Sequence, residues 1–540
     1  MAESQSKEIT LTLLPSQAAD PEYIKKEIKN RKDLNGLKIK SYRVIRKSID
    51  ARKNPVKVNL GIIVSEDKEV ESSFVERKYC RLPDNSKQIV IIGAGPAGLF
   101  AGLRAIQLGL KPVIIERGKD VDNRRLDIAK ISRQGEIDPN SNYCFGEGGA
   151  GAFSDGKLFT RSKKRGSVKE VLEILHQFGA CEEILISSHP HIGSDKLPTV
   201  IKNIREKIKD CGGEVRFNTL MEDVIIENNR ATGVRTSDGE VIKGAVFLAT
   251  GHSSRDVYRM LDSKGITLEP KGIAVGVRLE HPQHLIDQIQ YHSKEGRGKY
   301  LPAAEYSFVD QANGRGVYSF CMCPGGVIVP AVSDKKQIVV NGMSASARSG
   351  KWANSGYVVE LHPGDIPGYE GAGIFEMMAL QENLEKKFSE VSNGSLKAPA
   401  QKIEDFLNGR KSEQLPQTSY APGIISSDFN EIFPKEINER LKIGLKQIGR
   451  RCKKFISNEG LMIGLESRTS SPVRIPRDSL GLNHKEIQDL YPMGEGAGYA
   501  GGIVSSAIDG IKCVEAYYRS LESVEKNQDN HLRTPENEKI

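Results

Sequence analysis

Three glycines are spaced as in loops that bind a pyrophosphate. Gly93, Gly95 and Gly98 form the pattern G-x-G-x-x-G between an apolar run, QIVII, and a stretch with helical character over 96–108. The first glycine permits a tight turn, the second lets the backbone approach a pyrophosphate, and the third allows a helix to pack closely on a sheet. The helix N-terminus adds free N–H groups and a positive dipole end. The pattern predicts a dinucleotide site.

A second apolar run, PVII, leads into an acidic residue. Glu116 stands about twenty residues after the glycine pattern. At that position a carboxylate can bind the hydroxyls of a ribose, and it argues against the 2′-phosphate of NADP. We therefore expect contacts to the dinucleotide from Pro96, Ala97, Glu116 and Arg117.

Two later motifs favour FAD over NAD. Ala249-Thr250-Gly251 ends an apolar run after several short strands and resembles the second fingerprint of flavoproteins. YPMGEGAG (491–498) resembles the motif in which a strand ends at Gly-Asp and the acid binds the flavin ribitol, with Glu in place of the usual Asp. AGGIVSSA then begins a helix whose N-terminus can stabilise negative charge on the reduced ring. The expected contacts are Val224, Thr250, Gly251, Gly494, Glu495, Gly501, Gly502 and Ile503.

Residues 145–157, FGEGGAGAFSDGK, contain too many glycines for a stable helix or strand. The segment stands where related flavoproteins run a Gly-Gly loop along the flavin. Gly148 and Gly149 are therefore candidate backbone contacts. A flexible surface loop is the alternative.

The segment ESRTSSPVRIPRD is a candidate site for an anionic substrate. Arg468, Arg474 and Arg477 lie among three hydroxyl residues, and arginines bind carboxylates in bidentate fashion. A strip of surface salt bridges is the alternative. Weaker candidates of the same kind are Lys157, Arg348 and Lys351.

Three further residues could take part in catalysis. His252 directly follows the Ala-Thr-Gly motif and is a candidate proton donor, although a lone histidine is more often structural. Cys321 and Cys323 would share one face of a regular strand, with Cα atoms about 7 Å apart, at the limit for a disulfide. Two packed thiols are favoured over a redox pair.

Several stretches give the chain a family resemblance. With the flavin fingerprints, YCFGEGGAGAFSDGKL, SFCMCPGGVIVPA, GMSASARSGKWANSG and ESRTSSPVRIPRD spread this resemblance over residues 87–520. The chain resembles the uncharacterised FAD-dependent dehydrogenases, or NAD(P)/FAD-dependent oxidoreductases, of the glutathione-reductase-like two-dinucleotide-binding flavoprotein superfamily. The resemblance implies bound FAD and a redox role, and it names no substrate.

A second G-x-G-x-x-G with a strand–turn–helix frame does not occur, nor does a C-x-x-C or C-x-x-x-x-C dithiol. Members of the superfamily with a separate NAD(P)H domain are therefore poor guides. If NAD(P)H is a transient electron donor for this flavin, it docks without a Rossmann site of its own.

Composition limits the class of protein. With 38% hydrophobic and 27% charged residues, and apolar runs too short to span a membrane, the chain reads as a soluble globular protein. Its first residues lack a signal peptide, so we expect a cytoplasmic location without membrane partners. Between residues 22 and 57, thirteen Lys or Arg stand against four Asp or Glu. Nucleic-acid binding by this stretch is less expected than a solvated face.

These observations predict an α/β fold with five segments. A small basic α+β domain (1–80) precedes a Rossmann-like FAD-binding domain, formed by 87–270 and 485–522, with a mixed α+β substrate or cap domain (271–484) inserted and a polar tail at 523–540. We expect an FAD-dependent oxidoreductase that transfers a hydride between flavin and an organic small-molecule substrate, without a metal. The alternatives are a flavoprotein that binds or modifies nucleic acid and a non-catalytic FAD-binding protein.

Overall fold

The computed structural model describes residues 6–67, 69–70, 74–160 and 166–532. The N-terminal unit is an antiparallel sheet of order β1-β3-β2 with helices on one side. Ile24 and Ile28 of the amphipathic second helix pack on Leu60 and Ile62 of the sheet in one core. The elements are β1 (Ser6–Leu13), α1 (Pro15–Ala18), α2 (Pro21–Lys29), η1 (Lys32–Leu34), β2 (Ser41–Asp50) and β3 (Lys57–Ser65).

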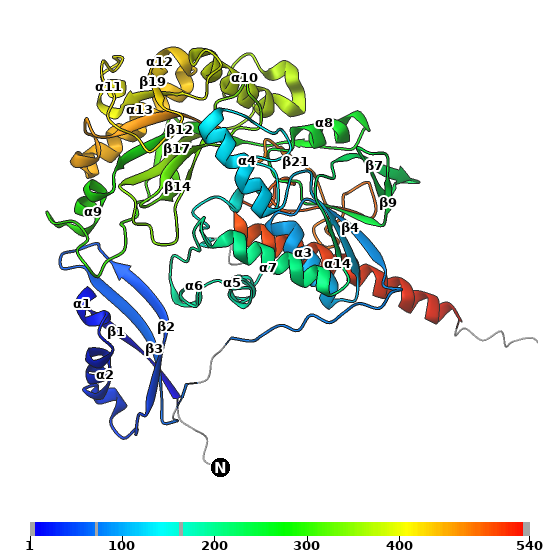
Figure 1. The fold of residues 1–540 in the computed structure, drawn as a ribbon, viewed down its shortest axis with the longest axis horizontal. Coiled ribbons are helices and arrows are strands. Elements are labelled where there is room, and N and C mark those ends of the chain that lie inside the picture. Colours follow the sequence, from blue (N-terminus) through cyan, green and yellow to red (C-terminus); the bar gives the residue numbers. More distant parts are fainter. Residues whose placement is uncertain (1–5, 68, 71–73, 161–165, 533–540) are drawn as a thin grey trace, which may run out of the picture.

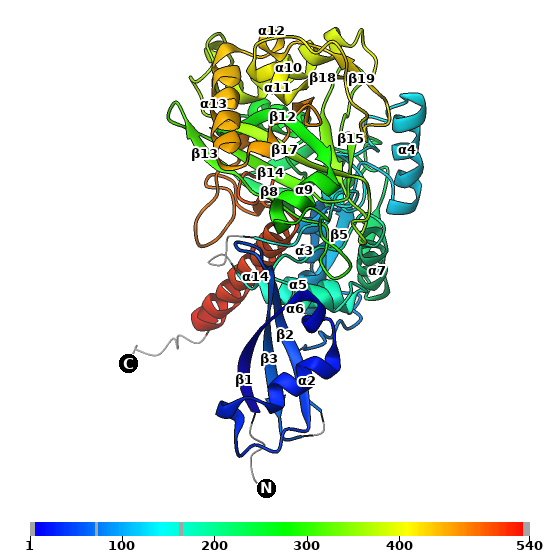
Figure 2. The ribbon, with the colours of Figure 1, turned by 90° about the vertical axis from the view of Figure 1, so that its left-hand side faces the viewer.

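This unit projects from the rest of the molecule (Figure 2) and contacts it through charged pairs. Arg43 pairs with Glu182, and Lys47 pairs with Glu183 at 3.1 Å. Only part of the basic surface is therefore neutralised. Nucleic-acid binding by the remainder stays the less expected alternative.

The next part of the chain forms a five-stranded parallel sheet of order β22-β10-β4-β5-β6. Ile89 and Ile91 face a layer of helices, whereas Val90 faces an antiparallel meander, so both faces are buried. This explains the lack of polar alternation in these strands. The strands are β4 (Gln88–Ile92), β5 (Lys111–Ile115), β6 (Glu214–Arg216), β10 (Ala245–Leu248) and β22 (Leu490–Pro492), and the meander is β7 (Met221–Glu227), β8 (Arg230–Thr236) and β9 (Val241–Lys243).

Helices α3, α7 and α14 lie together beside this sheet (Figure 1). Pro96 begins α3, where its fixed φ suits the first helical position and its missing N–H costs nothing. Ser167 caps α5 by accepting the N–H of Glu170 at 3.0 Å, as the capping pattern indicates. The helices are α3 (Pro96–Gln107), α4 (Val121–Gln134), η2 (Gly149–Gly151), α5 (Val168–Gln177), α6 (Glu183–Ile186), α7 (Leu197–Asp210) and α8 (Arg255–Ser263).

The segment predicted to be the cap, and called the cap below, is built on a seven-stranded sheet of order β13-β14-β17-β12-β20-β18-β19. Helices α10 to α13 lie at the top of Figure 2, whereas α9 lies below β12 and β17. Its strands are β12 (Ile273–Pro282), β13 (Val309–Ala312), β14 (Arg315–Cys323), β17 (Trp352–Leu361), β18 (Ala398–Lys402), β19 (Ile424–Ser426) and β20 (Leu461–Glu466), with the pairs β11 (Glu269–Pro270)–β21 (Val473–Arg474) and β15 (Val327–Pro330)–β16 (Val340–Met343). Its helices are α9 (Gln283–Tyr291), η4 (Glu370–Phe375), α10 (Glu376–Val391), α11 (Ile403–Leu407), α12 (Phe429–Ile432), α13 (Lys435–Arg451) and η5 (Lys453–Phe455).

The last helix, α14 (Ile503–Leu532), is longer than the sequence suggested. We expected a helix ending near residue 520 and a polar tail from 523, but the segment LESVEKNQDN contains no proline or glycine to stop it. Of the tail, only 533–540 lie outside the described residues. No described helix is apolar over a length that would cross a membrane, and the described residues contain no cluster of three or more His, Cys, Asp or Glu suited to a metal ion.

Candidate functional site

One cavity opens at the carboxyl ends of β4, β5, β10 and β22 and extends to the cap strands. Fourteen of the predicted cofactor contacts line it: Gly93, Gly95, Pro96, Ala97, Glu116, Arg117, Gly149, Thr250, Gly251, Gly494, Glu495, Gly501, Gly502 and Ile503. The two glycine-rich segments, about four hundred residues apart in the chain, therefore meet in one site.

The glycine turn fits a pyrophosphate. Gly93 has φ +104°, and a Cβ there would lie 2.5 Å from the oxygen of Ala249. A Cβ on Gly98 would lie 1.9 Å from the oxygen of Gly93, so this glycine serves helix packing and lies outside the cavity wall. A Cβ on Gly95 would meet only the Cα of Gly149, at 3.8 Å. The space beside Gly95 is open to a ligand, as the pattern predicts.

Glu116 is held by the main chain around this turn. Its Oε2 accepts the N–H of Ala94 at 2.9 Å, and its Oε1 accepts those of Gly118 at 2.9 Å and Gly146 at 3.0 Å. A carboxylate offers about four acceptor positions, so about one remains for a ribose hydroxyl. The carboxylate thus also joins the turn to the glycine-rich loop at Gly146.

That loop is held by one buried arginine. Arg124, 0% exposed, donates to five main-chain oxygens between residues 142 and 149 at 2.7–3.1 Å. Burial lowers the pKa of Arg124 to about 10, so it stays charged at neutral pH. The loop is therefore anchored, which contradicts the alternative of a flexible surface loop. Nothing in the sequence marked Arg124 for this role.

Two of the remaining expected contacts lie outside the cavity. Gly148, with φ +80°, donates its N–H to Ala94 at 2.8 Å, and a Cβ there would lie 2.5 Å from Ile201. Its role is to fit the loop against α7. Val224 is 0% exposed in the core between the meander and the sheet. Met221 at the start of β7 and the two residues before it, Thr219 and Leu220, line the cavity instead, and no sequence pattern marked them.

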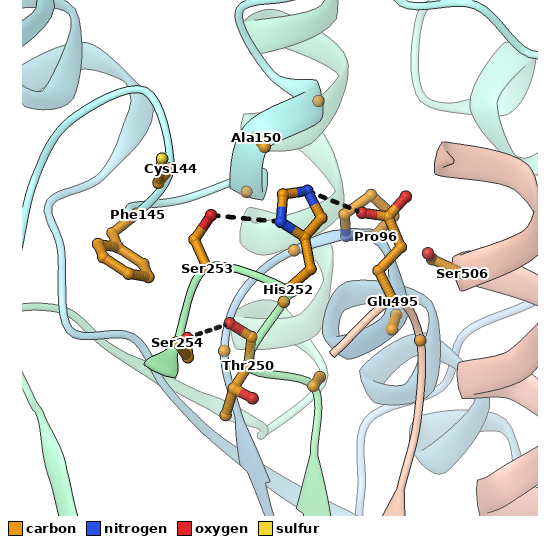
Figure 3. Close-up of a pocket in the computed structure, with 18 of the residues that line it drawn as sticks. Pro96, Cys144, Phe145, Ala150, Thr250, His252, Ser253, Ser254, Glu495 and Ser506 are labelled. Atoms are coloured by element: carbon orange, nitrogen blue, oxygen red, sulfur yellow. Dashed lines mark hydrogen bonds and ion pairs between the residues drawn. The ribbon is translucent and has the colours of Figure 1, made fainter. Parts of the chain in front are cut away.

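Thr250, His252 and Glu495 lie together in the cavity (Figure 3), beside the glycine turn, since a Cβ on Gly93 would lie 3.5 Å from the Cα of Thr250. Glu495 accepts the N–H of Gly502, and its Oε2 lies 3.5 Å from Nε2 of His252. The Oγ1 of Thr250 is buried, and no described residue satisfies it. A buried hydroxyl without a partner is a feature that a bound flavin would complete.

His252 is positioned between two polar groups. Nδ1 lies 3.3 Å from the hydroxyl of Ser253, opposite the Glu495 contact (Figure 3). Burial lowers the pKa of His252, although the charge of Glu495 opposes this shift. The ring is therefore neutral at pH 7 and has one nitrogen able to accept a proton.

Arg468 lines the cavity, yet all its donors are used within the protein. Its five N–H groups make two bonds to Glu385 at 3.1 Å and one each to Cys144, Ser333 and Gln337. None is left for a bidentate contact with an anion. Arg468 thus holds together the residues around it at the cavity wall.

The other two arginines of that segment lie outside the cavity wall. Arg474 is partly exposed and lies 3.9 Å from Glu269. Arg477 donates to Asp509 at 2.6 and 3.0 Å, and Asp509 in turn accepts the N–H of Gly494 at 2.8 Å. The arginine therefore supports the loop before α14, and Asp509 is a residue that sequence patterns did not indicate.

Lys157 lines the cavity on the cap side. Arg348 lies behind it and pairs with Asp155 and, at 2.6 Å, with Glu305. Lys351 is exposed and outside the cavity wall. Of the candidate anion-binding cations, Lys157 is thus the one that faces the cavity without a described carboxylate within salt-bridge distance.

The chain matches a family model that names the cofactor. Residues 272–469 match "FAD-dependent protein, C-terminal domain-like", and residues 5–65 match a domain of unknown function. The first match covers most of the cap, whereas the fingerprint residues lie on the other side of the cavity. The chain is a flavoprotein, and its cofactor is FAD.

A protein of Clostridium beijerinckii, described as uncharacterized, is 39% identical over 515 residues, which are 92% of this chain and 96% of the relative. The chain belongs to the same family as that protein. A thiamine thiazole synthase of Aeropyrum pernix is 23% identical over 167 residues, or 31% of this chain and 50% of the relative.

Among solved structures, a tetracycline destructase is similar at 11% identity and a TM-score of 0.33, covering 82% of this chain and 83% of its own. A geranylgeranyl bacteriochlorophyll reductase-like protein of Thermoplasma acidophilum is similar at 12% and 0.35, covering 82% and 80%. At these TM-scores, neither likeness bears on the activity of this chain.

Proposed function

We propose that this chain is an FAD-dependent oxidoreductase that transfers a hydride between the flavin and an organic substrate bound under the cap. In this proposal a Rossmann-like FAD-binding domain carries the cofactor and the inserted cap carries the substrate. The observation that supports it most is the continuity of the cavity, which runs from the flavin fingerprints to Phe320, Asn341 and Thr469 of the cap segment.

The cap side of the cavity favours a substrate with an apolar body and an anionic group. The side chains of Phe159 and Phe320 line it and are 53% and 36% exposed. Exposed aromatic rings in a cavity are typical of a binding surface for an apolar ligand. Lys157 supplies a positive charge on the same side, suited to a carboxylate or phenolate.

The reaction also needs a group that stabilises negative charge and a group that transfers a proton, and the chain offers one of each at the cavity. When bound, FAD supplies the two-electron chemistry. The N-terminus of α14, at Gly502 and Ile503, lines the cavity, where its positive dipole end would stabilise negative charge. We assign proton transfer to His252, because its imidazole is neutral and can accept a proton. The carboxylate of Glu495, whose Oε2 lies 3.5 Å from Nε2, would then stabilise the charged ring.

An anaerobic titration tests the proposal. FAD-loaded protein is mixed with NADH, with NADPH and with a panel of reduced aromatic acids, and flavin bleaching is followed. We expect at least one donor to bleach the flavin, and the Lys157→Gln variant to need more of an anionic donor than the control Lys335→Gln, which changes an exposed lysine outside the cavity. Oxidised flavin that no donor changes would contradict a catalytic role and favour a structural one.

A further inference from the structure

Two cysteines of the cap meet at the edge of the flavin cavity. Cys321 and Cys323 end β14, where the pairing with β17 shifts between Phe320 and Cys323 and inserts an extra residue. Cys321 adopts φ +46°, in the left-handed region that non-glycine residues rarely enter. A bulge re-aims side chains, and here Cys321 lines the cavity.

The two thiols differ in access. Cys321 lines the flavin cavity and is partly exposed, whereas Cys323 is 0% exposed behind it. The Sγ of Cys323 also lies 3.4 Å from the main-chain oxygen of Cys321. One sulfur is therefore placed to meet a molecule in the cavity, and the other is placed to meet the first sulfur.

A buried guanidinium lies beneath the pair. Arg278, 0% exposed, donates to the oxygen of Cys321 at 2.5 Å and to the Sγ of Cys323 at 3.7 Å. It also pairs with Glu466 at 2.9 Å, so its own charge is partly balanced. Lys157 adds a second positive charge from the cavity side.

These surroundings separate the two thiols chemically. The hydrogen bond from Cys323 lowers the pKa of Cys321, with Arg278 and Lys157 helping and burial opposing. The same hydrogen bond and burial raise the pKa of Cys323. At neutral pH the pair therefore combines a thiolate at the cavity with a thiol behind it, which is the arrangement that thiol–disulfide chemistry uses.

We propose that Cys321 and Cys323 form a redox-active dithiol that exchanges two electrons with the FAD of the same cavity. This inference rests on the proposed function, because it needs a flavin that changes redox state. Cys144, the other thiol that lines the cavity, contacts Ala331 and Arg468 and has no second thiol at its sulfur within the described part of the chain.

The reaction balances without a further reagent. The Cys321 thiolate, the Cys323 thiol and oxidised FAD give a Cys321–Cys323 disulfide and the reduced anion FADH⁻. The S–H bond of Cys323 breaks, an S–S bond forms, two electrons pass from the sulfurs to the flavin, and the thiol proton ends on the reduced flavin. In the reverse direction, FADH⁻ reduces the disulfide. The disulfide formed has an S–S bond of about 2.05 Å.

The test counts reducing equivalents and thiols in the FAD-loaded full chain. After oxidation with diamide and its removal, the protein is titrated anaerobically with dithionite, and samples are alkylated for mass spectrometry of the peptide that holds residues 321–323. We expect wild type and Cys144→Ser to take up twice the equivalents of Cys321→Ser. The peptide should gain two alkyl groups only after reduction. Cys323→Ser should take up the same number of equivalents as Cys321→Ser. If a serine at the buried position 323 prevents folding, the comparison of wild type with Cys321→Ser is sufficient.

Equal uptake by wild type and Cys321→Ser, with both sulfurs alkylated in the diamide-treated protein, would overturn the proposal and establish two packed thiols. A flavin that a donor reduces while this pair stays inert would refute the dithiol and leave the proposed function standing. A protein that holds no FAD would end both.

Discussion

The carboxylate of Glu116 allows a quantitative prediction for Glu116→Gln. It accepts three backbone N–H groups at 2.9–3.0 Å and keeps about one acceptor position for the ribose. An amide has one oxygen, so at least one of these buried N–H groups would face an NH₂ group. Leaving a buried donor unsatisfied costs about 1–3 kcal/mol, and a hydrogen bond to a charged group contributes about 1.5–3 kcal/mol. We expect the apo-protein to lose about 2 kcal/mol of stability.

FAD affinity should fall as well, because the ribose would lose a charged acceptor. A loss of about 2 kcal/mol corresponds to about a 30-fold increase in Kd. Flavin fluorescence on titration with FAD measures the affinity, and urea unfolding of the apo-protein measures the stability. Glu222→Gln, at an exposed position of β7 outside the cavity, is the control and should change neither. Unchanged Kd and unfolding midpoint in Glu116→Gln would refute the role given to this carboxylate.

Three further predictions concern buried positions outside the cavity wall. Burial lowers the pKa of His281 from 6.5 to about 4, so between these values the unfolded chain binds more protons than the folded one and stability is lost on acidification. Urea unfolding at pH 6.5 and pH 4 should show a loss of about 3 kcal/mol that His281→Gln lacks; equal losses would count against a neutral buried ring. A Cβ on Gly510 would lie 2.1 Å from a backbone oxygen of α3, so Gly510→Ala should cost about 1–3 kcal/mol by thermal unfolding, whereas Gly371→Ala, with no atom within 4 Å, should be neutral. Glu385→Gln should cost about 3–5 kcal/mol, because it leaves two buried arginines without their carboxylate, and Glu382→Gln on the same helix should cost less than about 1 kcal/mol; similar losses in the two variants would contradict this difference.

Local chemistry explains what the sequence could predict. The G-x-G-x-x-G turn depends mainly on local geometry, because Gly93 adopts φ +104° and a Cβ on Gly98 would lie 1.9 Å from the oxygen of Gly93 in the same turn. The carboxylate at the end of β5 follows from the length of one strand–helix–strand unit. Glu116 and the loop at Gly494 therefore reach the cavity as their motifs indicate.

The remaining features depend on residues that meet only after folding. Arg468 looked free for a substrate, but its main partner, Glu385, is 83 residues away in the chain. The glycine at 148 matched a flavin-contact pattern, yet its missing Cβ makes room for Ile201. A single inserted residue in β14 breaks the regular alternation from which we expected Cys321 and Cys323 to share one face at the limit of bridging.

The central claim, that FAD occupies this cavity, is tested most directly by the absorbance spectrum of the purified protein together with identification of the cofactor released on denaturation. The account predicts a flavin band at about 450 nm, FAD as the released molecule, and loss of both in Gly95→Val, whose side chain would fill the open space at the glycine turn. A colourless wild-type protein that cannot be reconstituted with FAD would contradict it.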